Sequence, residues 1–178
     1  MIAPFAEGFA YDRWANLEWT RKLHVLEEAE LAVRSLAATN GRDPDVGPLP
    51  VSPALRVMAH IGFAHRVWLE RVGVSAPELD VSGEKKLRAA AVGEALSMAE
   101  SAWKPVLVRS SDEVIAYQNL RGEPQARKLG EIISHVLNHG TYHRGQVRQM
   151  IADLGVSDFP DTDYLYFVMA RDAGRLPS

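Results

Sequence analysis

The stretch His135-Val-Leu-Asn-His139-Gly-Thr-Tyr-His143-Arg-Gly-Gln146 places three imidazoles at intervals of four residues in a strongly helical segment. Residues four apart on a helix lie about 5–6 Å apart at Cβ, so two such imidazoles can approach one metal ion. Three cannot, because about 12 Å of helix axis separates His135 from His143. The stretch therefore predicts a metal site that uses either His135 with His139 or His139 with His143.

A third ligand is expected from elsewhere in the chain, because open metal sites of the catalytic type use about three protein ligands. His60 is the natural candidate. It lies in residues 55–68, where the apolar side chains have the spacing of a second helix. His65 follows five residues later and points to another face. No function is assigned to His65 or to His24.

Three elements of the sequence together resemble the DinB-like superfamily. They are Tyr11-Asp-Arg-Trp14-Ala15-Asn16, His60 with Trp68 eight residues later, and Asn138-His139-Gly-Thr-Tyr-His143-Arg144-Gly145-Gln146. The resemblance spans nearly the whole chain, since Leu154-Gly155 and residues 159–165 also resemble the ending of that superfamily. It implies an all-α fold, a four-helix bundle that holds a divalent metal on three histidines.

The same resemblance selects among the histidines and suggests a chemistry. It implies that His60, His139 and His143 are the metal ligands and that His135 is a neighbour on the helix. The superfamily includes bacillithiol transferases and mycothiol-dependent maleylpyruvate isomerases. It therefore implies a metal-dependent thiol transferase or hydrolase acting on a small-molecule substrate, with a low-molecular-weight thiol as a partner. A homodimer is also expected, because dimers occur in the superfamily.

Length and composition fit one globular domain, expected over residues 1–178, with an ordinary hydrophobic content of 47%. The net charge of −3 and the scattered lysines and arginines provide no basic surface for nucleic acid. No apolar run approaches the ~18 residues of a membrane span, and the start carries Glu7 and Asp12 instead of a basic segment. We expect a cytoplasmic protein without nucleic-acid or membrane partners.

The chain contains no cysteine, which excludes disulfides, thiolate ligands and a protein thiol nucleophile. Imidazole and carboxylate remain as ligand types, and any thiol chemistry must use an external thiol. Three imidazoles suit several divalent ions. Zinc or nickel is the first expectation, with iron, manganese and copper as alternatives.

Apolar periodicity predicts four helices, over residues 9–38, 52–72, 84–108 and 129–154. Pro105 is expected to kink or end the third helix early, and a loop is expected over residues 39–50. Ser52 is the predicted N-cap of the second helix, with Pro53 at its first position, and Gly155 is the predicted C-cap of the fourth.

Two further segments are expected to have other structures. Residues 112–128 contain two short extended arms around Gly122 and Pro124, which predicts a small hairpin or irregular insertion before the last long helix. The tail from residue 158 is expected to pack back on the bundle through four apolar side chains, those of Phe159, Tyr164, Leu165 and Phe167.

Several residues around the histidines have alternative interpretations. Gly140 and Gly145 each cost about 1 kcal/mol in a helix interior, which indicates either a close helix approach or access of substrate to the metal. Arg144 is interpreted as structural. Asn138 and Gln146 are interpreted either as structural or as hydrogen-bond partners that orient the imidazoles.

The remaining candidates are assigned to packing or to solvent. The four tryptophans are interpreted as core residues and not as a substrate cage; they are Trp14, Trp19, Trp68 and Trp103. Tyr11 and Asn16 are placed either at the mouth of the metal site or in capping and core roles. The glutamates at positions 27, 28 and 30 are expected to face solvent, with the alternative that one of them completes a mixed metal site.

Two functions follow from a three-imidazole site. In the first, the protein is an enzyme whose metal, with an open coordination position, lowers the pKa of bound water toward ~7 or holds a thiolate. No acid–base residue is assigned in this enzyme. In the second, the protein is a non-catalytic metal-binding or stress-related protein in which the ion braces the second and fourth helices. A water ligand that faces a pocket would distinguish the first from the second.

Overall fold

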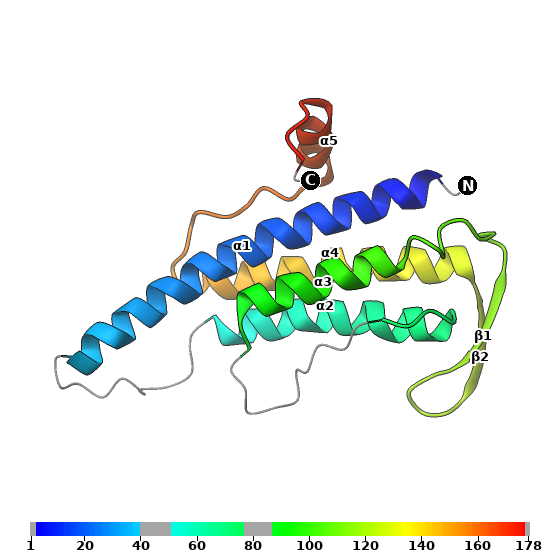
Figure 1. Ribbon diagram of the computed structural model, residues 1–178, viewed down its shortest axis with the longest axis horizontal. Coiled ribbons are helices and arrows are strands. Elements are labelled where there is room, and N and C mark those ends of the chain that lie inside the picture. The colour runs from blue at the N-terminus through cyan, green and yellow to red at the C-terminus, as the bar shows by residue number, and fades with distance from the viewer. Residues whose placement is uncertain (1–2, 40–50, 77–86, 177–178) are drawn as a thin grey trace.

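The computed structural model describes residues 3–39, 51–76 and 87–176, which form five helices and a two-stranded hairpin (Figure 1). In chain order the elements are α1 (Ala3–Thr39), α2 (Ser52–Arg71), α3 (Ala89–Ala102), β1 (Val114–Gln118), β2 (Pro124–Lys128), α4 (Leu129–Ala152) and α5 (Tyr164–Asp172). Helices α1 and α4 run in one direction along the bundle, and α2 and α3 run in the other. The predicted helical bundle with an insertion before its last long helix is confirmed.

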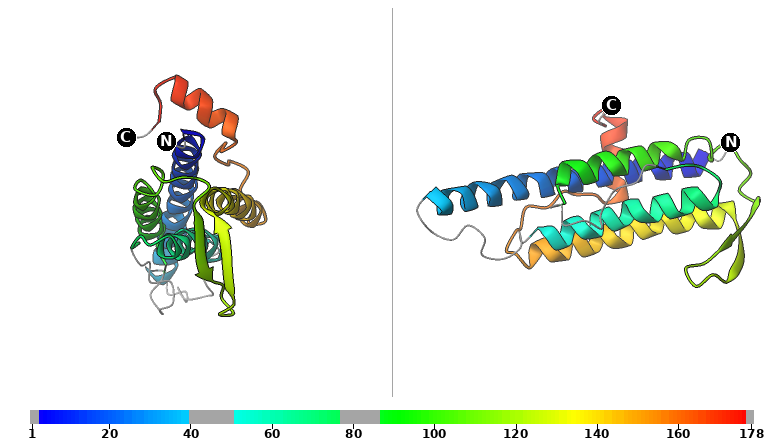
Figure 2. Two further views of the ribbon diagram at one scale, coloured as in Figure 1. Left: turned by 90° about the vertical axis from the view of Figure 1, so that its right-hand side faces the viewer. Right: turned by 60° about the horizontal axis from the view of Figure 1, so that its bottom comes forward.

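The four long helices form the corners of the bundle, as the end-on view in Figure 2 shows. Helices α1 and α2 each pack against both α3 and α4, so α1 and α2 lie on opposite corners. Two clusters of buried apolar side chains fill the space between the helices. One is built around Trp19, Leu23, Leu55, Met58, Ile61, Leu96 and Ile151, and the other around Phe9, Leu69, Trp103, Ile132, Ile133 and Val136. Burial of each large side chain contributes about 1.5–3 kcal/mol and fixes α2 beside α4.

The predicted hairpin is confirmed. Strand β1 pairs antiparallel with β2, with Val114 opposite Lys128, and the turn contains Gly122 at a φ of 78°. A positive φ of this kind favours glycine because it has no Cβ. The hairpin lies beside the end of α2 and the start of α4 (Figures 1 and 2). Helix α4 begins directly after β2, where the Glu131 carboxylate accepts a hydrogen bond from the Lys128 backbone N–H at 3.1 Å.

Several predicted helix boundaries differ from the structure. Helix α1 begins six residues earlier than predicted, and α3 is a shorter helix than residues 84–108. After α3 the chain continues in turns, so the prediction that Pro105 ends this helix early is confirmed; proline lacks the N–H that a helix requires. Ser52 is the first residue of α2 and not its N-cap, since the Val51 carbonyl already accepts the Leu55 N–H at 3.0 Å. The predicted loop over residues 39–50 starts one residue too early, since Thr39 is the last residue of α1; its other residues and residues 84–86 lie outside the described residues.

The end of α4 also differs slightly from the prediction. The helix ends at Ala152, two residues before the predicted end, and the chain then turns through Gly155 at a φ of 83°. The predicted role of Gly155 in terminating this helix is consistent with that left-handed conformation. Across the described parts of the chain, no helix combines the length and the hydropathy of a membrane-spanning segment.

The tail packs on the bundle through an additional helix that was not predicted. Asp163 caps α5 by accepting the Leu165 N–H at 3.0 Å, and the helix lies across α1 (Figure 1). Phe167 is fully buried against the Tyr11 ring. The predicted packing through Leu165 was wrong. Leu165 lies two residues before the buried Phe167, which on a helix places its side chain on the opposite face, and it is 63% exposed.

Candidate metal centre

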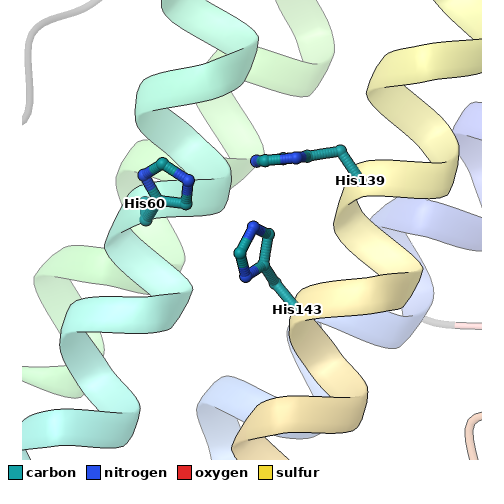
Figure 3. Close-up of side chains that lie close together, drawn as sticks. All are labelled: His60, His139 and His143. Carbon is teal, nitrogen blue, oxygen red and sulfur yellow. The ribbon is translucent and has the colours of Figure 1, made fainter.

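Three histidines predicted as ligands face one another across the gap between α2 and α4 (Figure 3). His60 comes from α2, and His139 and His143 come from successive turns of α4. One ring nitrogen from each lies within 4.8 Å of the others, and the ring centroids are 4.2–5.1 Å apart. The spacing on the helix left open whether His139 pairs with His135 or with His143. In the structure His60 lies beside His139 and His143.

His135 lies one turn before His139 and outside this cluster. Its ring centroid is 5.5 Å from that of His139 and 5.5 Å from that of Trp68. It is exposed, and it is a neighbour of the cluster on the same helix.

The chemistry of the three imidazoles fits a metal ion. His139 Nε2 is buried and has no hydrogen-bond partner among the described residues. Burial and the neighbouring imidazoles lower the pKa of His139 to about 4, and burial and the His143 imidazole also lower the pKa of His60. The rings of His139 and His60 are therefore neutral at pH 7, which is the form that offers a lone pair to a metal. A divalent ion would satisfy the orphaned nitrogen.

One of the two predicted orienting residues contacts a candidate ligand. Gln146 Oε1 lies 2.7 Å from His143 Nδ1, where a carbonyl oxygen accepts the ring N–H. This tautomer leaves Nε2 of His143 free to bind an ion, as is usual for metal-bound histidine. Asn138 instead donates to the Ser134 carbonyl at 2.8 Å on its own helix, so it does not orient an imidazole.

The opposite face of α4 carries a buried polar network. Arg144 donates to Asp12 Oδ1, to Asn16 Oδ1 at 2.9 Å and to Thr141 Oγ1 at 3.0 Å. The Arg144 side chain is 3% exposed and that of Asp12 is 1% exposed. This arrangement agrees with the structural role predicted for Arg144, because it fixes the position of α4 against α1 one residue away from His143.

The network extends from Asp12 and Asn16 to the two remaining helices of the bundle. His65 Nε2 on α2 lies 3.3 Å from Asp12 Oδ2, and His65 Nδ1 accepts the Trp103 Nε1–H at 3.2 Å. Asn16 Nδ2 donates to Glu100 Oε1 on α3 at 2.7 Å. Each long helix of the bundle thus contributes a polar group to one buried cluster.

The two carboxyl groups of this network have pKa values shifted in opposite directions. Burial acts to raise the pKa of Asp12, but Arg144 and His65 outweigh it and lower that pKa. Burial and the Asp12 charge together raise the pKa of Glu100 to about 8. At pH 7 the network therefore holds one buried ion pair, Asp12 with Arg144, beside a neutral carboxyl group.

The two glycines of α4 differ in their surroundings. A Cβ added at Gly140 would meet Asp12 Oδ1 at 2.6 Å and Arg144 Nη1 at 3.0 Å, whereas one added at Gly145 would meet nothing within 4 Å. Gly140 therefore permits the close approach of α1 to α4 at the level of the candidate ligands. The open space at Gly145 rules out close helix packing there.

The prediction that the glutamates of α1 all face solvent was wrong for Glu27. It is fully buried, accepts the Ala89 N–H at 3.2 Å and lies 3.3 Å from Arg88 Nε, so it caps the start of α3. Oxygens of Glu27 and Glu28 also lie within 4.8 Å of a His24 nitrogen. Arg88 occupies both carboxylates, which opposes a mixed metal site. The signal was present in the sequence, since Glu27 continues the four-residue spacing of two core residues, Trp19 and Leu23.

The buried roles of Asp12, His65 and Glu100 were also missed. Asp12 and Asn16 are four residues apart on the apolar face of α1, a pattern that could have indicated a buried polar pair. Nothing in the local sequence around His65 or Glu100 indicates their partners.

Comparisons with known proteins agree with the geometry. The sequence matches the model described as "DinB family" over residues 50–174, a range that includes all three clustered histidines. "Protein DinB" of Bacillus subtilis (strain 168) is 46% identical over 44 residues, which are 24% of this chain and 25% of that protein. The match thus spans about a quarter of the length of that curated relative. No solved structure matches the chain.

Proposed function

The chain belongs to the DinB family, and from this premise we propose that it is a metal-dependent enzyme with a divalent ion on His60, His139 and His143. The reaction type that we propose is thiol transfer or hydrolysis. Zinc or nickel is the proposed ion, with iron or manganese as alternatives, because imidazole ligands suit several divalent metals.

The observation that carries the proposal is the unpartnered Nε2 of His139. A buried nitrogen without a partner costs about 1–3 kcal/mol, and an ion shared with the two neighbouring imidazoles would remove that cost. His60 is exposed, so one side of the cluster faces solvent. This exposed side supports an open coordination position on the ion, which a water molecule or a thiol could reach.

The roles of the protein side chains follow from their contacts. Gln146 holds the Nδ1 proton of His143 and keeps the ring directed at its neighbours. The Asp12–Arg144 pair and the small Gly140 fix the distance between α1 and α4. When bound, the ion supplies positive charge that lowers the pKa of a water or thiol molecule entering the site. We assign no general acid or base among the surrounding residues.

The partner that we propose is an external low-molecular-weight thiol, because the chain contains no cysteine. The homodimer implied by the family resemblance stays a prediction.

A second candidate function is a non-catalytic protein in which the ion braces the bundle. The observation that favours it is that the ligands come from two helices, α2 and α4, so the ion would cross-link them.

Metal content tests the site. We would measure bound metal by plasma mass spectrometry in tag-free wild type and in His60→Ala, His139→Ala and His143→Ala, with His135→Ala as the matched control from the same helix. We expect near-stoichiometric metal in wild type and the control and its loss in the other three. Equal loss in His135→Ala, or no metal in wild type after loading with divalent ions, would contradict the site.

Cobalt substitution separates the enzyme from the brace. A thiol that binds Co²⁺ directly gives a charge-transfer absorption band, so we would titrate the cobalt-loaded protein with dithiothreitol. We expect a saturable band that is absent in His139→Ala. An unchanged spectrum would support an ion that only braces α2 and α4.

A further inference from the structure

A second feature near the candidate metal centre is a cavity of about 310 Å³ beside His135. We call it the aromatic pocket. It is lined by Trp68, Tyr117, Arg127, Glu131, Ile132 and His135. These residues come from α2, the hairpin and α4, which meet at this end of the bundle (Figures 1 and 2). The volume is at the lower end of the range of small-molecule sites, roughly 300–1,000 Å³.

One side chain, that of His135, lies between the pocket and the candidate metal centre. The His135 ring lies 5.5 Å, between centroids, from Trp68 on one side and 5.5 Å from His139 on the other. A small molecule in the pocket would therefore lie one helical turn from the first proposed ligand on α4.

The walls of the pocket are aromatic and held in place. Trp68 and Tyr117 pack edge to face, with ring centroids 5.1 Å apart. The Arg71 guanidinium lies 4.5 Å from the Trp68 centroid and 4.7 Å from that of Tyr117, and it donates to the Gln118 carbonyl at 3.2 Å. Such a cation over two rings fixes both of them. Rigid aromatic walls of this kind suit a planar, unsaturated group.

The rim of the pocket carries the positive charge of Arg127. Arg127 donates to the adjacent Ala126 carbonyl at 2.7 Å, and none of the described carboxylates forms an ion pair with it. Glu131 shares the pocket, but its carboxylate accepts the Lys128 N–H at the start of α4. The planar fork of an arginine matches the two oxygens of a carboxylate.

We propose that the aromatic pocket binds a small aromatic carboxylate. Its ring lies against Trp68 and Tyr117, and its carboxylate pairs with Arg127. This inference deepens the proposed function and rests on it for one point, that the bound molecule is a substrate. Binding itself requires the residues of the pocket and not the ion.

Calorimetry with cinnamate tests the pocket, with its neutral amide, cinnamamide, as the matched ligand. We would titrate both into protein treated with EDTA and into zinc-loaded protein. We expect cinnamate to bind both forms with similar affinity and cinnamamide to bind about tenfold more weakly or worse, because the amide lacks the charge that pairs with Arg127.

Two variants and one control locate the binding. Arg127→Ser and Trp68→Ala should each weaken cinnamate binding by about tenfold, whereas Arg121→Ser, an exposed arginine at the tip of the same hairpin, should leave it unchanged. Arg127 is exposed, so its variant tests the pocket without disturbing the core.

The outcomes separate this inference from the proposed function. Cinnamate binding that requires zinc and ignores Arg127→Ser would place the carboxylate on the ion and overturn the inference. Absence of binding to folded, metal-free protein at millimolar cinnamate would overturn it as well. Binding to the pocket in a protein that takes up no metal would support the pocket and refute the metal-dependent function.

Discussion

Helix α4 presents polar residues on two faces, and the two faces differ in where their partners come from. On the inner face, Arg144 forms hydrogen bonds to Asp12 and Asn16 on α1. On the outer face, His139 is surrounded by other imidazoles, and its buried Nε2 has no partner among the described residues. The Arg144 guanidinium thus finds its partners within the protein, whereas the three imidazoles of the outer cluster leave a lone pair of His139 for an external ligand.

This difference explains how one helix can both hold the bundle together and form a site. Residues 143 and 144 are adjacent, so the ion pair of Arg144 also limits the movement of His143. Buried polar groups that are fully paired favour one arrangement of the helices. The inner network thus positions the outer imidazoles, and changes in each face should have separable effects.

The largest expected effect comes from breaking the inner ion pair. Arg144→Ala leaves the Asp12 charge buried and unpaired, which should lower the free energy of unfolding by about 3–5 kcal/mol. Urea denaturation followed by circular dichroism measures it. Replacing both partners, Asp12→Leu with Arg144→Met, should recover part of the loss.

The exposed Arg148, one turn further along α4, provides the matched control. It lies over the Phe159 ring at 4.6 Å, so Arg148→Ala should cost about 1 kcal/mol or less. Equal losses in Arg144→Ala and Arg148→Ala would contradict a structural role for the inner network.

The next effect is a pH dependence that arises from Glu100. Its pKa is raised to about 8 in the folded protein from 4.5, so between these values the unfolded chain releases a proton that the folded protein keeps. The free energy of unfolding of the wild type therefore falls as pH rises from about 5 to 8, because the folded protein holds the Glu100 proton more tightly than the unfolded chain does. Glu100→Gln removes this dependence and should be more stable than wild type by roughly 4 kcal/mol at pH 8, from the interval of 4.5 to about 8 at 1.36 kcal/mol per pKa unit.

The measurement is the difference in unfolding free energy between Glu100→Gln and wild type at several pH values. Other titrating groups contribute equally to both proteins and cancel. The difference should be small near pH 4.5 and grow toward pH 8. A constant difference across this range would show that the Glu100 carboxyl is not held neutral.

A third, smaller effect compares the two glycines of α4. Gly140→Ala inserts a methyl group 2.6 Å from Asp12 Oδ1 and should destabilise the protein by about 1–3 kcal/mol. Gly145→Ala meets open space and should stabilise it by about 1 kcal/mol, because alanine is the better helix former. Thermal unfolding of the two variants would show shifts of opposite sign, and shifts of the same sign would contradict the close approach at Gly140.

The sequence predicted the outer face of α4 better than the inner face. The spacing of His139 and His143 is local, and helical periodicity alone places both on one side of α4. Their partner His60 lies 79 positions before His139 in the sequence and was selected by family resemblance as well as by its helix. The positions of all three histidines are as predicted, while their role as ligands stays a prediction.

The inner network was not predictable in the same way. Asp12 and Arg144 are 132 residues apart, and Asn16 and Glu100 are 84 apart. Whether such residues meet depends on the packing of whole helices, which local patterns do not specify. The burial of Glu27 was missed for a related reason, because a run of charges was assumed to be exposed when one member faces the start of α3.

The smallest effect distinguishes a ligand from a residue that orients it. Gln146→Ala removes the acceptor that holds the His143 Nδ1 proton, and loss of such a contact usually weakens metal binding by about 10–100-fold. We expect about tenfold, equivalent to about 1.4 kcal/mol, from competition with a fluorescent zinc chelator. Asn138→Ala is the control and should leave the affinity unchanged, because the Asn138 amide donates to the Ser134 carbonyl of its own helix. The unfolding free energy of metal-free Gln146→Ala should stay close to that of wild type, since Gln146 contributes no bond to the inner network. Weaker zinc binding at constant stability would show that the outer face is tuned independently of the inner one, whereas a matching loss of stability would show that the two faces act as one unit.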